Sequence, residues 1–308
     1  MEHFLIYANQ QKDRGLAVTG RIRRYLESRG KQVAVVTGEG GPGPEKSQKD
    51  GKGPMGGPEA GGNPEDREGS RAGQKQEVPA PDCMIVLGGD GTGLQALRET
   101  GSLHIPLIGV NLGTLGYLTE IEPAHLEEAL EKLVAGEYEQ ENRMMLSGRV
   151  FLTEGGTEED WALNDIVISR SGSLQIIRFH IYVNGQFLNS YDADGMIVTT
   201  PTGSTGYNLS AGGPLVEPGA RLILLTPICP HSLNQRSIVL SPEDVVEIEI
   251  PLGRDGGGQR VEANFDGSHV IRLGTGDRIR ILRSGKTTEF LRLNHVSFLE
   301  VLHRKMSN

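Results

Sequence analysis

A glycine-rich segment between a strand-like and a helix-like stretch places the strongest constraint on the fold. The segment, GGDGTG at residues 88–93, directly follows the apolar run at residues 84–87 and precedes a helical pattern. A turn of this kind belongs to a strand–loop–helix unit, in which backbone amides at the start of the helix can point at a phosphate. Taken alone, it is equally compatible with a tight turn that binds nothing.

The stretches on both sides of this segment alternate between strand-like and helix-like patterns. Residues 3–8 and 32–37 predict short buried strands, and the helical stripe between them ends at Gly30. The same alternation predicts strands at 83–87 and 106–110 and helices at about 92–100 and 123–134. We therefore expect residues 1–140 to form an open, Rossmann-like α/β nucleotide-binding domain.

The pattern changes after residue 145. Short alternating runs replace the helical stripes, at residues 148–152, 162–169, 179–183, 195–199, 245–250, 261–265 and 278–282. The dipeptides Asn184-Gly185, Asp255-Gly256 and Asp266-Gly267 favour hairpin turns. Residues 141–285 are therefore predicted to form a mostly antiparallel β-sandwich domain. Apolar residues from Phe290 onwards predict that residues 286–308 return to the first domain.

Residues 39–81 interrupt the first domain with a Gly- and Pro-rich segment that contains no Leu, Ile or Phe. This composition buries too little apolar area to offset the entropy of ordering, which favours a disordered insertion over a folded lid.

Composition excludes several classes of function. With a net charge of −9 over 308 residues and no basic cluster, the chain is not expected to bind a nucleic-acid polymer. No signal-peptide pattern and no run of the roughly 18 apolar residues needed for a bilayer occurs, so we expect a cytoplasmic protein without membrane contact. Cys83 and Cys229 stand far apart, which indicates reduced thiols.

Three further polar motifs are candidates for chemistry. Asn164-Asp165 stands at a strand entry and is also typical of an ordinary turn. Asp192-Ala193-Asp194 brings two carboxylates within two residues, which surface turn chemistry explains nearly as well. Residues 201–214, PTGSTGYNLSAGGP, combine small polar residues, glycines and a tyrosine, a composition that suits a flat polar ligand better than a plain connection.

Together these motifs resemble the bacterial NAD kinases. The order and spacing of GGDGT at 88–92, Asn164-Asp165, Asp194-Gly195 and the residue 200–214 segment all agree, from about residue 82 to about residue 270. The resemblance implies phosphorylation of the 2′-hydroxyl of the adenosine ribose of NAD, giving NADP. It implies ATP or inorganic polyphosphate as phosphoryl donor, a divalent cation such as Mg²⁺, and a homodimer or homotetramer.

The resemblance also implies roles for individual residues. Asp90 corresponds to the proton acceptor, and Gly88, Gly89, Gly91 and Thr92 to the phosphate-binding loop. Contacts with NAD are implied for Asp90, Gly91, Asn164, Asp165, Gln175, Asp192, Asp194, Thr205, Gly206, Tyr207, Asn208, Leu209 and Ser210.

Two alternatives remain at this point. A lipid kinase can use a similar glycine-rich loop for ATP, but it would need an apolar acyl pocket, which the polar 201–214 segment disfavours. A non-catalytic dinucleotide sensor could share the fold, although Asp90 would then have no chemical task.

Overall fold

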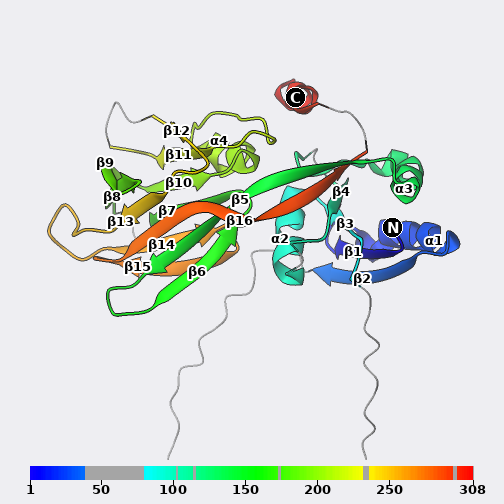
Figure 1. Ribbon diagram of the computed structural model, residues 1–308, viewed down its shortest axis with the longest axis horizontal. Coiled ribbons are helices and arrows are strands. Elements are labelled where there is room, and N and C mark those ends of the chain that lie inside the picture. Colours follow the sequence, from blue (N-terminus) through cyan, green and yellow to red (C-terminus); the bar gives the residue numbers. More distant parts are fainter. Residues whose placement is uncertain are drawn as a thin grey trace, which may run out of the picture.

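The protein is described by a computed structural model that covers residues 1–38, 80–101, 103–113, 116–172, 175–231, 236–293 and 297–307. Nearly all of the predicted insertion at 39–81 lies outside these residues. The described chain forms two lobes that are joined by two long strands (Figure 1). Within it, no helix has the length and apolar character needed to cross a membrane.

The first lobe is an α/β layer structure. Its parallel strands lie in the order β2-β1-β3-β4, with bounds β1 His3–Asn9, β2 Gln32–Gly38, β3 Cys83–Gly88 and β4 Leu107–Asn111. Every residue of β3 is buried, as expected for a parallel strand that is covered on both faces. The glycine-rich loop leaves the carboxyl end of this strand.

Helices cover the two faces of this sheet. On one face α1 (Ala17–Ser28) packs with α3 (Leu126–Ala135), and on the other lies α2 (Asp90–Thr100). Single turns of 3-10 helix, η1 (Arg14–Leu16) and η2 (Pro123–His125), precede α1 and α3. The α2 helix begins at Asp90, two residues before the predicted start, so Asp90 lies in its first turn.

The second lobe consists of two sheets packed face to face. The larger sheet contributes β5 Glu139–Phe151, β6 Thr157–Ala162, β8 Ile177–Val183, β9 Gln186–Ala193, β13 Val246–Glu249 and β16 Arg278–Arg292. The smaller sheet has the order β12-β11-β10-β7-β14-β15, with bounds Ile238–Leu240, Ile223–Ile228, Gly195–Thr199, Asp165–Arg170, Arg260–Phe265 and His269–Gly274. One apolar core fills the space between them. The predicted fold class, an α/β lobe followed by an antiparallel β lobe, is confirmed.

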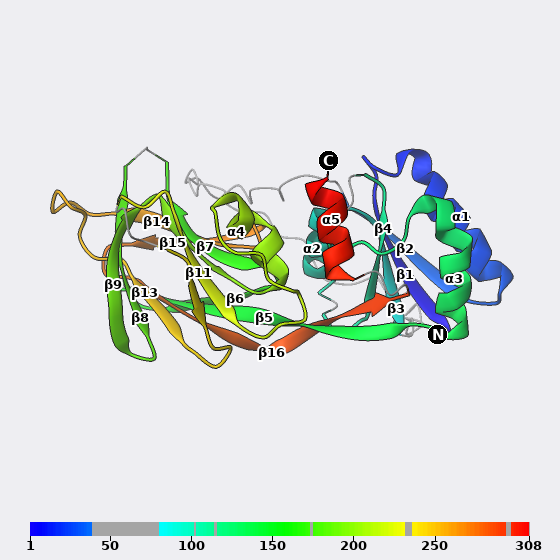
Figure 2. The same ribbon diagram turned by 90° about the horizontal axis from the view of Figure 1, so that it is seen from above.

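Two strands of the large sheet, β5 and β16, extend through both lobes. β16 pairs with β5 from Arg278–Phe151 to Arg292–Glu139 and also pairs with β4 at Phe290–Leu107. A single ten-stranded sheet therefore continues through both lobes (Figure 2). The domain boundaries predicted at residues 140 and 285 fall inside β5 and β16, so that division stays a prediction.

The sequence patterns did not predict several of the strands. They are β6, β9, β11, β12 and β15. β9 is exposed on both faces over its first five residues, so hydrophobicity does not alternate there. Asn184-Gly185 and Asp266-Gly267 do form hairpin turns, between β8 and β9 and between β14 and β15. The expectation for Asp255-Gly256 was wrong, because it connects β13 and β14, which belong to different sheets.

The chain ends in helix α5 (Phe298–Met306), none of whose residues is buried. Its Phe298 ring lies 6.0 Å from the ring of Tyr117, and its Lys305 Nζ lies 4.4 Å from the same ring. This places α5 beside the loop that follows β4 (Figure 2).

Candidate active site

The glycine-rich loop is a tight strand-to-helix turn. β3 ends at Gly88, Gly89 is the N-cap of α2, and Asp90 is the first helical residue. The Thr92 hydroxyl accepts hydrogen bonds from the Gly89 amide and from Asn9 Nδ2, both at 3.4 Å. A side chain at residue 88 would overlap Thr92, so only glycine allows the turn to close. The amides at the start of α2 are thereby held at the edge of the sheet.

Backbone amides from a distant loop hold the Asp90 carboxylate. Tyr117 N donates to Oδ2 and Leu118 N donates to Oδ1, each at 2.9 Å. A Cβ at residue 116 would overlap Asp90 Oδ1, so Gly116 is what lets this loop approach. Both carboxylate oxygens therefore have a donor, and the carboxylate is fixed at the first residue of α2.

A lysine lies over the glycine-rich loop. Lys12 follows β1, and its Nζ lies 3.0 Å from the position that a Cβ of Gly89 would occupy. The sequence analysis missed this residue because it stands far from the loop in the chain. No sequence motif around Lys12 indicates that it lies near the loop. The effect is a positive charge next to the amides of the loop, where a phosphate-binding site requires one.

One buried carboxylate organises the Asn164-Asp165 turn. The Asp266 side chain, 0% exposed, accepts hydrogen bonds from the amides of Leu163, Asn164 and Asp165 at 2.8, 2.8 and 3.2 Å. Arg98 on α2 places Nη2 3.7 Å from Asp266 Oδ2. The sequence marked Asp266 only as part of a hairpin dipeptide, whereas it also fixes this turn against α2.

The two buried carboxyl groups of this turn share an unusual electrostatic environment. Burial, and to a smaller extent the nearby Asp266 carboxylate, together raise the pKa of Asp165 to about 7. Burial also raises the pKa of Asp266, but its three backbone donors and Arg98 oppose the rise. Because Asp266 has these partners, Asp165 is the group that holds a proton near neutral pH.

The Asn164 side chain presents an unused acceptor. Its Oδ1 is buried and has no hydrogen-bond partner within the described residues. A buried polar group without a partner costs about 1–3 kcal/mol, so it marks a place where a ligand donor fits. A cavity of about 400 Å³ opens here, and it is lined by Leu94, Asn164, Asp165, Val167, Ser169, Tyr207, Asn264, Asp266 and Gly267. Leu94 belongs to α2, so this cavity is walled by the helix that begins with Asp90.

The 201–210 segment forms two short turns beside this cavity, η3 (Thr202–Thr205) and α4 (Tyr207–Ser210). Asn208 is fully buried and supports the segment: Nδ2 donates to the carbonyls of Ser204 and Pro214, and Oδ1 accepts from the Thr226 hydroxyl at 2.6 Å. The side chains of Tyr207 and Leu209 are instead exposed. Thr205 donates to the Thr202 carbonyl at 3.3 Å, and Gly206 lies close to Asn164 Nδ2.

The remaining predicted contact residues lie elsewhere. β10 runs from Gly195, opposite Ser169, to Thr199, opposite Asp165. Asp194 is therefore five residues from the Asn164-Asp165 turn, or about 17 Å along the strand. Asp192 pairs with Arg178 at 2.9 Å, Asp194 lies 3.5 Å from Arg170, and Gln175 is exposed. The structure thus separates Gln175, Asp192 and Asp194 from the other predicted residues.

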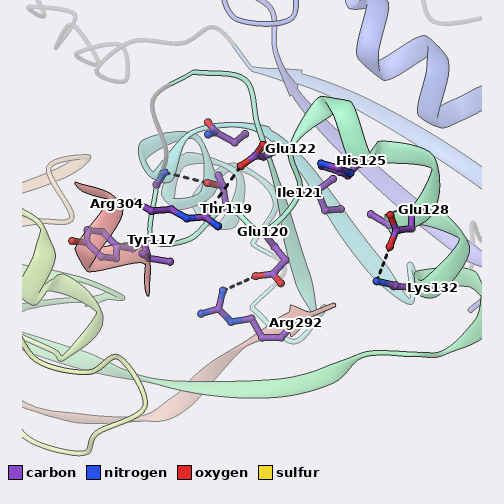
Figure 3. A pocket seen from close by; sticks show the side chains of 14 residues that line it. Tyr117, Thr119, Glu120, Ile121, Glu122, His125, Glu128, Lys132, Arg292 and Arg304 are labelled. Atoms are coloured by element: carbon purple, nitrogen blue, oxygen red, sulfur yellow. Dashed lines mark hydrogen bonds and ion pairs between the residues drawn. The ribbon is translucent and has the colours of Figure 1, made fainter. Parts of the chain in front are cut away.

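A second cavity, of about 430 Å³, lies between α3, α5 and the loop after β4 (Figure 3). It is lined by Tyr117, Glu120, Glu122, Lys132, Arg292 and Arg304, among others. In the part of the chain that the structure describes, no cluster of three or more His, Cys, Asp or Glu side chains is arranged to hold a metal ion.

The protein thus joins an α/β lobe with a glycine-rich strand-to-helix loop to an antiparallel β lobe with a cavity beside the same helix. Family models for the ATP-NAD kinase N-terminal domain and C-terminal domain match residues 4–138 and 163–293. An NAD kinase from Lachnospira eligens is 42% identical over 315 residues, covering 99% of this chain and all of the relative. One from Agathobacter rectalis is 43% identical over 309 residues, covering 100% and 99%. The chain belongs to the NAD kinase family and is a kinase that acts on NAD.

Two solved structures share the fold. Yeast NADH kinase complexed with NADH has a TM-score of 0.78 at 22% identity, with 100% of this chain and 88% of that chain covered. An NAD kinase from Archaeoglobus fulgidus in complex with ATP has a TM-score of 0.69 at 25% identity, with both chains fully covered.

Proposed function

We propose that this protein transfers the γ-phosphoryl group of ATP to the 2′-hydroxyl of the adenosine ribose of NAD and releases NADP and ADP. The observation that carries the proposal is the unpaired, buried Asn164 Oδ1 in a cavity whose wall includes α2. The exocyclic amine of an adenine is a donor that fits this acceptor. The ribose attached to such an adenine would then lie toward the Asp90 end of the helix.

Asp90 acts in this proposal as the general base. A ribose hydroxyl is a weak nucleophile, so it gains from a carboxylate that accepts its proton while its oxygen forms the bond to the γ-phosphorus. The bond between that phosphorus and the bridging oxygen breaks, and ADP leaves. Asp90 is presented by the amides of Tyr117 and Leu118, which fix the carboxylate before the substrate arrives.

The phosphates of the donor are assigned to the glycine-rich loop. The Gly91 amide in the first turn of α2 and Lys12 provide a donor and a positive charge, whereas the Gly89 amide donates to the Thr92 hydroxyl and the Thr92 amide to the Gly89 carbonyl. Mg²⁺ enters as part of the MgATP substrate, because this ion keeps phosphate and water ligands and needs few from the protein. The ATP complex of the Archaeoglobus fulgidus relative supports ATP as the donor.

The dinucleotide is assigned to the turns around the smaller cavity. Asn164 and Asp165 face the adenosine, and the backbone and exposed side chains at residues 205–210 contact the rest, while Asn208 supports them from within. Asp194 directly precedes β10, about 17 Å along the strand from the Asn164-Asp165 turn, Asp192 lies near the end of β9, and Gln175 lies just before β8, whose Ile177 is opposite Ala193, so we assign none of the three to the same end of the ligand. We propose that they complete the site of a neighbouring copy in a homo-oligomer.

The test is turnover of the purified protein with NAD and MgATP. The proposal expects NADP, with the new phosphate on the 2′-oxygen as located by ³¹P NMR. A lipid kinase would instead phosphorylate a diacylglycerol, and a sensor would bind NAD without consuming ATP. Either result in place of NADP would contradict the proposal.

A further inference from the structure

A chain of alternating charges lies where β5 and β16 pass from one lobe to the other. Glu141 Oε2 accepts a hydrogen bond from Arg143 Nη2 and another from Arg292 Nε, both at 2.9 Å. Arg292 Nη1 in turn donates to Glu120 Oε2 at 2.8 Å, a contact visible in Figure 3. This chain of charged side chains therefore links β5, β16 and the loop that follows β4.

One end of this chain reaches the segment assigned to the dinucleotide. Arg143 Nη1 donates to Thr202 Oγ1 at 3.2 Å, and Thr202 is the first residue of η3. The Arg143 side chain is 1% exposed, and its guanidinium carbon lies 5.3 Å from the centroid of the Phe290 ring. Such close confinement leaves the guanidinium little freedom, so it fixes where the 201–210 segment begins.

The other end reaches the amides that hold the proposed base. Glu120 follows Leu118 by two residues, and the amides of Tyr117 and Leu118 donate to Asp90. The Glu120 side chain is 6% exposed and also accepts from the Leu293 amide at 3.3 Å. Arg292 thus fixes Glu120, and Glu120 fixes the loop whose amides present the Asp90 carboxylate.

The charges in the middle of the chain depend on one another. Burial alone would raise the pKa of Glu141, but Arg143 and Arg292 hold it below its ordinary value. Burial lowers the pKa of the Arg143 guanidinium, whereas the carboxylates of Glu141 and Asp90 raise it. Loss of one member would leave a buried charge without its partner.

We propose that Arg143 is a positioning residue for phosphoryl transfer. It holds the start of the 201–210 segment directly, and through Glu141, Arg292 and Glu120 it holds the backbone that presents Asp90. The inference rests on the proposed function, because it assigns Asp90 to the proton transfer and the 201–210 segment to NAD. Arg143 touches neither reactant. Its effect is to fix the two sides of the reaction relative to each other.

Arg143→Met and Arg143→Lys test this in the full-length protein, with kcat, both KM values, the Kd for NAD and the melting temperature measured. We expect kcat to fall about 10- to 100-fold in Arg143→Met, more than NAD binding weakens, since a 1 Å misplacement can cost about 100-fold. Arg143→Lys keeps the charge and should recover part of kcat. Arg149→Met is the matched control: it cuts an exposed pair with Glu159 on the same strand and should leave kcat unchanged.

A double-mutant cycle between the two ends covers the case in which Arg143→Met does not fold. Glu120→Gln removes the contact with Arg292 at one end, and Thr202→Val removes the contact with Arg143 at the other. If the two sites acted independently, their fold-decreases in kcat would multiply. We expect the fall in kcat of the double variant to be at least about threefold smaller than the product of the two single falls, because either substitution alone already breaks the connected set of ion pairs. Losses that multiply, or a folded Arg143→Met with kcat within about threefold of wild type, would overturn the inference. A wild-type protein that makes no NADP would overturn the proposed function and this inference with it.

Discussion

The Asn164-Asp165 turn and the Asp192-Ala193-Asp194 segment look alike in sequence, yet their surroundings differ. The first lies against Asp266 and α2 and contains a buried acceptor without a protein partner. In the second, Asp192 is bound by Arg178, and Arg170 lies close to Asp194. An unmatched buried polar group is costly unless a ligand matches it, whereas a matched exposed pair is stable by itself. The comparison favours the first segment as the adenosine site.

The largest expected effect lies at the helix that the first segment contacts. Asp90→Asn keeps the shape of the side chain but cannot accept the hydroxyl proton, and loss of a general base typically lowers kcat about 10²- to 10⁴-fold. The KM for NAD should change far less. Steady-state kinetics at saturating NAD and MgATP checks this, with a melting curve to show that the variant is folded. Activity within a few-fold of wild type would remove Asp90 from the mechanism.

A smaller effect is expected in the stability of the first segment. Asp165 has a pKa of about 7 in the folded protein, well above its value of about 3.9 in an unfolded chain. Between these values only the folded state holds the proton, so this group's contribution to the free energy of unfolding falls as pH rises from about 4 to 7. Asp165→Asn should therefore raise the melting temperature at pH 8, by several degrees, and change it little below pH 4.

Melting curves of the ligand-free protein at the two pH values decide this point. Asp192→Asn serves as control, because the pKa of Asp192 is lowered by its hydrogen bond with Arg178 rather than raised. If Asp165→Asn shifts the melting temperature equally at both pH values, folding does not raise the pKa of Asp165.

The smallest expected effect lies in the second segment. Asp192→Asn removes a partly exposed ion pair, which contributes about 0–1 kcal/mol, so stability should change little. If the segment completes a neighbouring site, the KM for NAD should rise up to about fivefold, and only at protein concentrations where copies associate. Kinetics over a dilution series, with sedimentation to report association, measures this. An equal rise in dissociated protein would place both segments in the site of one chain.

The parts of this architecture that depend on local sequence were predictable. The strand, loop and helix around Asp90 have complete local patterns, and the structure places β3 and α2 within two residues of the predicted bounds. The sandwich followed from alternating runs such as those of β8 and β14. β9 was missed because its first half is exposed on both faces, which removes the alternation on which the prediction depends.

The partners of the site residues were beyond the reach of sequence patterns. Asp90 is held by amides more than twenty residues away, and Lys12 and Asp266 reach the site from the loops that follow β1 and β14. Backbone donors leave no residue-type signal, and a buried Arg143 looks like any charged residue of an alternating strand. The family resemblance grouped Asp194 with Asp165 as dinucleotide contacts, whereas the strand register places Asp194 five residues along the strand from the Asn164-Asp165 turn.

The central claim is that the cavity beside Asn164 binds the adenosine of NAD. Isothermal titration of NAD into wild type, Asn164→Ala and Asp192→Asn tests it most directly, under conditions where copies are dissociated. The account predicts that Asn164→Ala weakens binding by about 1–3 kcal/mol, or roughly 5- to 150-fold, because the amide's hydrogen bonds to a buried ligand are lost. It predicts that Asp192→Asn binds as wild type does. Unchanged affinity in a folded Asn164→Ala would place the dinucleotide elsewhere and contradict the account.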